Sequence, residues 1–351
     1  TPNTPFCYWW GPTNTHRAWV RGSGKRLWGL DPDALIGRLP AFLPDVPEMR
    51  EDVCDYLGEC MAFDRGLGVL IDELEARGVL DETLVVVSGD HGIPGFPRAK
   101  CNLYDIGCEV ALCARLPGAI PAGRVIDDMV NLMDLAPTFL DAGQCPQPDG
   151  MVGRSLWPLL TSTDSGQIDP SRDYVVTGRE RHVASARDLN LPYPQRAIRT
   201  NDHLYIVNFA PERWPMGKPC GLDDLQSPAP SHEALVSDTF CCYPDLDASP
   251  AKACMIERRA EPSFRHAFDL GFGKRPAEEL YDLRSDPDQM HNLAADPAHQ
   301  AKREALRKKL FEVLEANHDP RVNAAPCRFE ASPYTDWPIA DNDAEERLAQ
   351  S

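Results

Sequence analysis

The strongest candidate for chemistry in this sequence is an acidic residue followed directly by a histidine. Asp90 and His91 stand within Ser88-Gly-Asp-His-Gly92, just after the apolar run Leu84–Val87. Loops at the carboxyl ends of strands in open α/β sheets form ligand sites, because the sheet holds them rigidly. A carboxylate beside an imidazole on a tight glycine turn can supply half of a divalent metal site. The same residues also fit an ordinary turn in which Asp90 caps the following loop.

Two further side chains are candidates for holding an oxyanion. Lys100 ends a loop rich in Pro and Gly, and a cation there would bind a sulfuryl or phosphoryl group and offset charge on the leaving oxygen. His16 lies in a polar turn and would donate a hydrogen bond or a proton to the same group. Both residues also have an ordinary interpretation, as a solvated loop lysine and a histidine in a surface turn.

A second charged group follows later in the chain. The run Arg179-Glu-Arg-His182 predicts either a specificity rim for an acidic sugar or a solvated face. Arg196 and Arg199 lie on an expected strand and would add bidentate contacts to a carboxylate or sulfate. The candidate substrate-binding residues are His182, Arg179, Glu180, Arg199 and Arg17, the last beside His16.

No complete nucleophile arrangement accompanies these residues. The sequence has no Gly-x-Ser-x-Gly elbow and no glycine-rich phosphate loop. Neither Cys113 nor Cys145 has neighbours that would activate a thiol. The residues by themselves therefore indicate part of an anion and metal site without an attacking group.

The elements that must position these residues alternate in type. Apolar residues recur at steps of three and four over Tyr56–Leu74, which predicts a helix beginning near Glu51 and ending at Gly78. The β-branched run at Leu84–Val87 predicts a strand buried on both faces, and Val110–Leu116 predicts the next one. A helix followed by such strands indicates α/β layering.

Other segments are less regular. The aromatic run at 6–10 predicts a strand, and residues 131–140 predict a short or kinked helix because Pro137 lies inside it. Residues 173–177 and 197–207 predict strands, the second turning at Asn201-Asp202. Residues 210–265 predict a long loop or lid, and Ala301–Asn317 an amphipathic helix.

Composition limits the function classes. The chain has 351 residues, a formal charge of −18 and no apolar run long enough to cross a bilayer. This acidity argues against nucleic-acid binding, which needs clustered Lys and Arg. The twelve cysteines allow one or two disulfide bridges among Cys220, Cys241, Cys242 and Cys254. A polar stretch at 160–172 predicts a boundary between 1–165 and 166–351.

The order of several segments resembles the sulfatase family. Each segment alone is weak, but the series spans most of the chain. In chain order the segments are Tyr56–Asp64 with Gly68, Leu74, Gly78, Thr83 and Ser88–Gly92; Lys100–Gly107 with Val110 and Arg115–Gly118; Asn131–Thr138; Asp149–Leu156; and Glu279–Asp288 with Asn292-Leu293. The resemblance implies an alkaline-phosphatase-like α/β fold, a mixed sheet flanked by helices. Residues 1–165 would be the C-terminal part of that core, and 166–351 a smaller α+β subdomain with antiparallel strands, a long loop and a terminal helix.

A further set of segments is similar to the heparan N-sulfatase (sulfamidase-like) branch. These segments are Ile93–Lys100 with Asn102-Leu-Tyr104, Gly178–His182, Tyr193–Arg199, Asn208-Phe and Arg213-Trp-Pro215. The resemblance implies hydrolysis of sulfate from N-sulfated or O-sulfated glucosamine of heparan-type glycans. It also implies that Asp90 and His91 ligate a divalent metal, normally Ca2+, that Lys100 and His16 contact the sulfate, and that His182 lines the sugar pocket.

Two departures from the family pattern matter. The Cys/Ser-x-Pro/Ala-x-Arg signature, whose nucleophile is oxidised to formylglycine, and the paired metal-binding aspartates are not found, so we expect them upstream of residue 1. His91 stands where many sulfatases carry Asn. An imidazole suits Zn2+ or Mn2+ better than Ca2+, so a related function as a phosphodiester or phosphonate monoester hydrolase stays open. A third alternative is an inactive truncated paralogue that binds glycan. The expected protein partners of the chain are its own N-terminal fragment or further copies in a homo-oligomer. The resemblance favours a periplasmic or secreted location.

Overall fold

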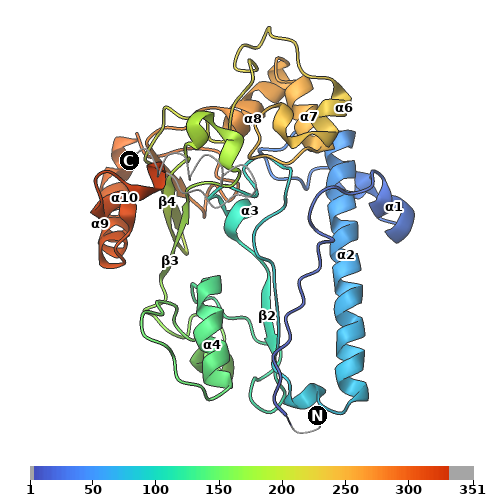
Figure 1. The fold of residues 1–351 in the computed structure, drawn as a ribbon, viewed down its shortest axis with the longest axis vertical. Helices are drawn as coiled ribbons and strands as arrows, with labels where there is room; N and C mark the ends of the chain where they lie inside the picture. Colours follow the sequence, from blue (N-terminus) through green and yellow to red (C-terminus); the bar gives the residue numbers. More distant parts are fainter. Residues whose placement is uncertain (1–3, 332–351) are drawn as a thin grey trace, which may run out of the picture.

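A long helix runs along one side of the molecule (Figure 1). The computed structural model describes residues 4–331, and helix α2 spans Pro47–Ala76 within them. Proline at the first position suits a helix start because its missing N–H would have no partner there. Beyond the last turn, Gly78 takes a positive φ of 69°. The helix predicted from Glu51 is thus confirmed, and it packs against α1 (Ser23–Trp28) and α7 (Pro250–Glu257).

The aromatic run at 6–10 is not a strand, so that prediction was wrong. The segment has no regular structure, and the Trp10 ring stacks on Phe63 of α2 with 5.0 Å between ring centroids. Phe6, Tyr8 and Trp9 are largely exposed. A strand needs a neighbouring strand for its backbone hydrogen bonds, and in the part of the chain that the structure describes this segment has a helix beside it instead.

Two short strands form the sheet next to α2. β1 (Val85–Ser88) pairs antiparallel with β2 (Leu112–Arg115), with Val85 opposite Arg115. Both predicted strands are confirmed, but the expected burial of the first strand on both faces is wrong, because all four residues of β1 are only half-buried. Asp90 and His91 follow β1, and the one-turn helix α3 (Asp105–Cys108) precedes β2.

A short helical region lies in the lower part of Figure 1. The 3-10 turn Leu132–Asp134 leads into α4 (Leu135–Ala142), and the side chain of Asn131 caps this start. Pro137 falls in the first turn of α4, where it interrupts no helical hydrogen bond. The predicted short helix is therefore confirmed. A further short helix, α5, spans Trp157–Thr161.

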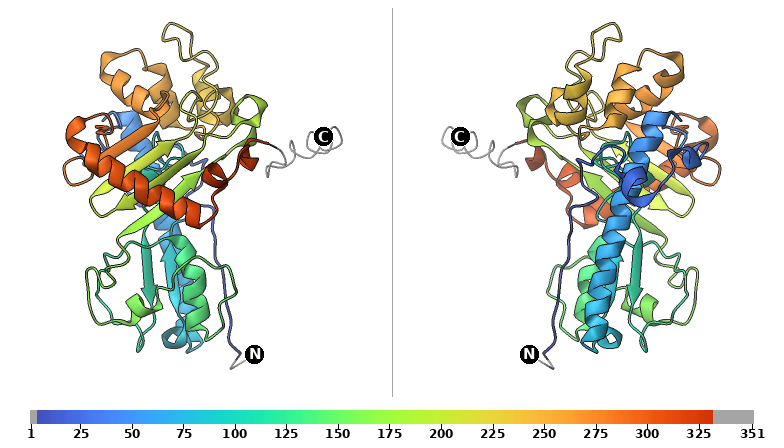
Figure 2. Two further views of the ribbon diagram at one scale, coloured as in Figure 1. Left: turned by 90° about the vertical axis from the view of Figure 1, so that its left-hand side faces the viewer. Right: turned by 90° about the vertical axis from the view of Figure 1, so that its right-hand side faces the viewer.

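The second sheet has four strands in sequence order, all antiparallel. Its strands are β3 (Tyr174–Arg179), β4 (Gln195–Thr200), β5 (His203–Asn208) and β6 (Glu278–Asp282). The predicted turn at Asn201-Asp202 joins β4 and β5. Helix α9 lies across one face of this sheet (Figure 2).

Helix α9 confirms the amphipathic helix predicted near the C-terminal end. It spans Gln300–Ala316, and Leu306, Leu310 and Leu314 pack against sheet residues that include Ile198 and Tyr205. Its Lys and Arg side chains point outward, as the sequence pattern predicts. A short helix, α10 (Pro320–Asn323), and a 3-10 turn at Arg328–Glu330 follow.

Residues 210–265 are partly helical, so the predicted long loop or lid was wrong for the second half of that range. The helices there are α6 (His232–Ser237), α7 and the beginning of α8 (Pro262–Phe272), with a 3-10 turn at Thr239–Cys241. Every residue of 251–256 is buried. A helix without a polar face shows no contrast at the helical period, which explains why the sequence pattern missed α7.

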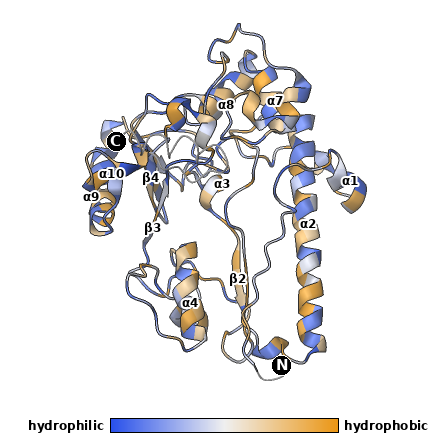
Figure 3. Cartoon of the chain, viewed as in Figure 1, coloured by the Kyte–Doolittle hydropathy of each residue, from blue (hydrophilic) through white to orange (hydrophobic). Residues whose placement is uncertain are grey.

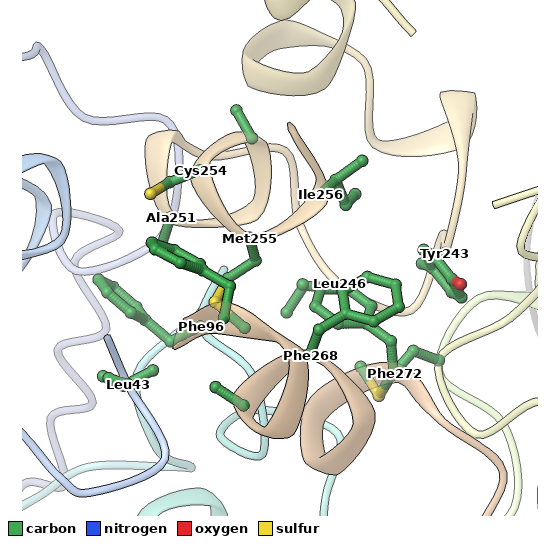
Figure 4. Packing of buried hydrophobic residues seen from close by; sticks show 14 of the residues in the cluster. Leu43, Phe96, Tyr243, Leu246, Ala251, Cys254, Met255, Ile256, Phe268 and Phe272 are labelled. Atoms are coloured by element: carbon green, nitrogen blue, oxygen red, sulfur yellow. The ribbon is translucent and has the colours of Figure 1, made fainter. Parts of the chain in front are cut away.

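The largest hydrophobic core joins these helices to the N-terminal part of the chain (Figure 4). Phe96 and Leu43 pack with Met255, Phe268 and Phe272 in this cluster. The cluster thus contains residues from both sides of residue 165, and the predicted boundary there stays a prediction. Residues 332–351 of the predicted second subdomain lie outside the described residues.

Two other properties of the described residues concern location and redox state. Among residues 4–331 no helix combines the length and apolar character needed to cross a membrane. All twelve cysteines are free thiols. Helix α2 carries hydrophobic residues among hydrophilic ones (Figure 3), and one of them, Val69, is 63% exposed.

Candidate functional site

Lys100 and His16 lie side by side although 84 residues separate them in the sequence. Lys100 Nζ is 3.3 Å from His16 Nε2, and His16 Nδ1 is 2.6 Å from the carbonyl oxygen of Arg17. A carbonyl oxygen only accepts hydrogen bonds, so Nδ1 must carry the proton and Nε2 accepts from the ammonium. Lys100 is buried and His16 is exposed, so the pair stands between interior and solvent.

A tightly folded loop sets the position of Lys100. The backbone N–H of Lys100 donates to the carbonyl oxygen of Ile93, and the Asn102 side chain donates to the Lys100 carbonyl. The chain passes so close to α3 that a Cβ at Gly92 would lie 1.7 Å from the Ile106 carbonyl oxygen. Only glycine fits there, which gives the Gly after His91 a structural reason.

Arg17 ties this loop to the helix and to the N-terminal segment. Its guanidinium binds both carboxylate oxygens of Asp52 on α2, at 2.6 and 2.8 Å, and donates to the Pro94 carbonyl at 3.1 Å. It also stacks on the Trp19 ring, 3.6 Å from the centroid. Arg17 therefore positions two parts of the site, the turn that contains His16 and the loop before Lys100. Its predicted role in binding substrate stays a prediction.

Asp247 is the acidic neighbour of Lys100, and sequence reasoning missed it. Its Oδ2 lies 3.4 Å from Lys100 Nζ, and the two side chains are 16% and 8% exposed. Asp247 stands in an irregular segment before α7, where no local pattern marks it. Only the packing of α7 against the N-terminal part of the chain brings it to Lys100.

His182 belongs to the same electrostatic neighbourhood. Burial lowers the pKa of His182, the Lys100 ammonium lowers it further, and the carboxylates of Asp245 and Asp247 oppose the change. The imidazole is therefore neutral at pH 7 and can serve as a donor or an acceptor. The structure thus brings together Lys100, His16 and His182 from three distant parts of the sequence.

Two buried arginines share one carboxylate beneath His182. Arg179 Nη2 lies 2.6 Å from Asp245 Oδ2, Arg187 binds the same oxygen, and the Val183 N–H donates to the other oxygen at 3.1 Å. Burial would raise the pKa of Asp245, but the two guanidinium groups outweigh it and hold that pKa below its usual range. Burial lowers the pKa of Arg187 to about 10. Asp245 thus holds both ends of the turn that carries His182, and no local sequence pattern marks either Asp245 or Arg187.

Glu180 has two arginine partners of its own. It accepts from Arg196 at 2.8 Å and binds Arg321 through both carboxylate oxygens. Arg196 also pairs with Asp319 at 2.6 Å. These ion pairs attach the segment around α10 to the turn after β3. Whether Glu180 also contacts a ligand stays a prediction.

Arg199 forms an ion pair with a different part of the chain. Its guanidinium pairs with Asp105 at the start of α3, with Nη2 to Oδ2 at 3.0 Å, and both side chains are about one fifth exposed. The pair joins the four-stranded sheet to the element that follows the Lys100 loop. Its predicted contact with substrate stays a prediction.

Asp90 and His91 form an open pair after β1. Asp90 Oδ1 accepts from the His91 N–H at 2.9 Å, and His91 Nδ1 donates to the Gly92 carbonyl oxygen at 2.8 Å. The two atoms left over, Asp90 Oδ2 and His91 Nε2, are 3.6 Å apart, a spacing that one cation between them can bridge. Among residues 4–331 there is no cluster of three or more His, Cys, Asp or Glu arranged for a metal. The pair therefore fits as part of a metal site that needs further ligands.

Comparison with known proteins extends this picture. Residues 90–176 match the family described as N-sulphoglucosamine sulphohydrolase, C-terminal. The chain is 29% identical over 304 residues to human (Homo sapiens) N-sulphoglucosamine sulphohydrolase, which covers 83% of this chain and 53% of that protein. It is 26% identical over 283 residues to an ulvan-active sulfatase of Formosa agariphila, covering 80% and 41%. The chain thus spans about half the length of the curated relatives it matches.

Solved structures show the same fold. One, described in complex with its substrate D-glucosamine-2-N,6-O-disulfate, matches with a TM-score of 0.53 at 20% identity over 80% of this chain and 43% of that one. The phosphonate monoester hydrolase of Agrobacterium radiobacter matches with a TM-score of 0.51 at 19% identity over 78% and 43%. The α/β fold of the alkaline phosphatase superfamily expected from the sequence is thus confirmed. The chain is thus similar to sulfatases, and in residues 90–176 to the sulfamidase-like members among them.

Proposed function

We propose that this chain takes part in hydrolysing sulfate from N-sulfated or O-sulfated glucosamine residues of heparan-type glycans. The observation that carries the proposal is the contact of 3.3 Å between Lys100 and the exposed His16, with His182 close enough for the ammonium to lower its pKa. An ammonium beside an imidazole can hold an oxyanion and exchange a proton with it. The named activity of the human relative and the sulfated glucosamine in complex with the structural relative support this substrate class.

The three side chains have different parts in this proposal. The Lys100 ammonium binds a sulfate oxygen and offsets the charge that develops on the leaving group. His16 Nε2, which accepts from Lys100 in the structure, becomes free to exchange a proton when the sulfate takes over that ammonium. His182 lines the sugar side of the site, where its low pKa keeps it neutral at pH 7.

A divalent cation and a formylglycine complete the proposal. Asp90 Oδ2 and His91 Nε2 would hold the cation, which supplies Lewis-acid polarisation of the sulfuryl group when bound. Ca2+ is the ion proposed on family resemblance, with Zn2+ or Mn2+ as alternatives because imidazole suits them better. The formylglycine nucleophile, the paired aspartates and a partner that would carry them stay predictions of the resemblance.

Binding of glucosamine N-sulfate measured by calorimetry tests the proposal. Lys100→Met should weaken binding roughly ten- to a hundredfold, because a charge-assisted hydrogen bond contributes about 1.5–3 kcal/mol. Lys25→Met, which removes an exposed ammonium on α1, is the matched control and should bind as the unaltered protein does. Equal affinities for the Lys100→Met variant and the unaltered protein would contradict the proposal. Release of inorganic sulfate from the same sugar reports turnover separately.

The imidazole of His91 favours one alternative function on the same fold. A nitrogen ligand suits Zn2+ or Mn2+, the ions with which a phosphodiester or phosphonate monoester hydrolase would work. Comparing phosphonate monoester and glucosamine N-sulfate as ligands separates the two functions. An inactive glycan-binding paralogue would bind the sulfated sugar and release no sulfate from it.

Organisation and location remain part of the proposal. The division into 1–165 and 166–351 and a periplasmic or secreted location are proposed on the family resemblance. A homo-oligomer or association with its own N-terminal fragment is proposed on the same ground. Sedimentation of the purified chain, alone and mixed with an N-terminal fragment, would test the partners.

A further inference from the structure

The site around Lys100 contains a carboxylate that a plain sulfate site would not need. Asp247 Oδ2 lies 3.4 Å from the ammonium that is proposed to receive the sulfate. A carboxylate repels sulfate oxygens, and the repulsion is strong where both groups are partly removed from water. Asp247 is the counter-ion of the buried Lys100 ammonium, and it can in addition answer a feature of one class of ligand.

Asp247 has free capacity to accept hydrogen bonds. Its ion pair with Lys100 is the one ion pair it makes within residues 4–331, and at 3.4 Å that pair is longer than a usual hydrogen bond. An ionised carboxylate offers about four lone-pair positions. Asp245, two residues earlier, differs in this respect because two arginines and a backbone N–H occupy its oxygens. Asp247 is thus the carboxylate available to a ligand at Lys100.

The chemistry of the sulfated group decides what Asp247 can accept. A sulfamate carries an N–H on the atom that bridges sulfur and carbon, whereas a sulfate ester has an oxygen there without a hydrogen. When the sulfate oxygens of a ligand contact Lys100 Nζ, its bridging atom lies within a few ångströms of that nitrogen. This is on the scale of the 3.4 Å between Lys100 Nζ and Asp247 Oδ2. A sulfamate can donate to the carboxylate, and an ester can only place oxygen against it.

We propose that Asp247 is a specificity-determining residue that favours sulfamates over sulfate esters. The inference rests on the proposed function, because it assumes that Lys100 receives the sulfate. It also assigns a preference within that function, for N-sulfated over O-sulfated sugars. A site with a buried polar group built for a donor rejects the analogue that lacks it, because the group is left unpaired.

A matched pair of ligands tests the proposal directly. Glucosamine N-sulfate and glucose 2-O-sulfate differ only in the bridging atom, N–H or oxygen. Calorimetry on the full chain should give at least about tenfold tighter binding of the sulfamate. Asp247→Asn should bring the two affinities to within about threefold, because an amide can donate to the ester oxygens as well. Asp223→Asn, an exposed carboxylate nearby in the sequence, is the control and should keep the unaltered ratio.

A second variant guards against a folding defect. Asp247→Ser removes the charge with a smaller side chain, and circular dichroism with urea unfolding checks that each variant is folded. Binding of both ligands with a ratio that neither variant changes would overturn the proposal and leave the proposed function standing. Binding of neither ligand by the unaltered protein would overturn the proposed function and this inference with it.

Discussion

Lys100 Nζ lies 3.3 Å from His16 Nε2, and Arg17 secures this contact by binding the loop before Lys100 as well as helix α2. The residue next to His16 thus acts as its anchor. The contact joins a turn near the N-terminus to the loop after β1. Because Asp52 also accepts from the Ala251 N–H, the same ion pair reaches the start of α7.

Loss of Arg17 should destabilise the fold strongly. Arg17→Met leaves the carboxylate of Asp52 buried without its counter-ion, which should lower the free energy of unfolding by about 3–5 kcal/mol. Arg21→Met removes a similar pair with Glu51 that is exposed, and it should cost no more than about 1 kcal/mol. Urea unfolding followed by circular dichroism measures both. Equal losses for the two variants would show that burial of the Arg17 pair does not matter.

The pKa of His182 should report on Lys100. Burial and the Lys100 ammonium both lower it, so Lys100→Met should raise this pKa toward the ordinary histidine value. The folded pKa lies below the unfolded one, so the neutral ring contributes stability that is fully present above about pH 6.5 and is lost as pH falls below that value. Titration of the His182 ring protons by NMR measures the shift. An unchanged pKa in Lys100→Met would mean that the two groups are not neighbours in solution.

Asp245 should be essential to the turn that carries His182. Asp245→Asn leaves Arg179 and Arg187 as buried cations without a counter-ion, with an expected loss of about 3–5 kcal/mol. Its folded pKa is below the unfolded one, so the stabilisation is present above about pH 4 and is lost as pH falls through the folded pKa. Urea unfolding at pH 7 is the measurement. Asp223→Asn, at an exposed site, should unfold as the unaltered protein does.

Thiol reactivity should follow burial. Burial raises the pKa of Cys242 to about 12, whereas Cys145 and Cys220 are exposed. The thiolate is the reactive form, so iodoacetamide at pH 8 should modify Cys145 and Cys220 first and Cys242 only after unfolding in urea. Peptide mass spectrometry over time distinguishes Cys145 and Cys220 from Cys242 and from the other exposed cysteines, Cys7, Cys108 and Cys113. Early modification of Cys242 in the folded protein would contradict the packing around α6 and α7.

Metal binding at Asp90 and His91 should be detectable with Mn2+. The paramagnetic ion should broaden the His91 ring signals in NMR spectra, and Asp90→Asn should reduce that broadening at equal Mn2+ concentration. Asp81→Asn removes another exposed carboxylate, one that pairs with Arg115, and is the control. Broadening of His91 that is the same in all three proteins would argue against a shared site.

Much of the fold was predictable because its signals are local. Some of these signals are periodic, as in α2 and α9, and others are an apolar run, as in β1 and β2, or a turn dipeptide, as between β4 and β5. The candidates Lys100, His16 and His182 came from residue type and family resemblance. Their gathering at one place is a finding of the structure, and their roles stay predictions.

The sequence by itself determined which segments have one apolar face and which residue types could hold an oxyanion. Only the tertiary structure decided that Trp10 packs against helix α2 and that α7 is buried on all sides. It also decided that Asp247 pairs with Lys100 and Asp245 with Arg179. Periodicity reports the contrast between two faces of one element, so a fully buried helix gives no signal. Ion pairs between residues far apart in sequence depend on how whole elements pack, and that packing leaves no trace in the local spacing of residues.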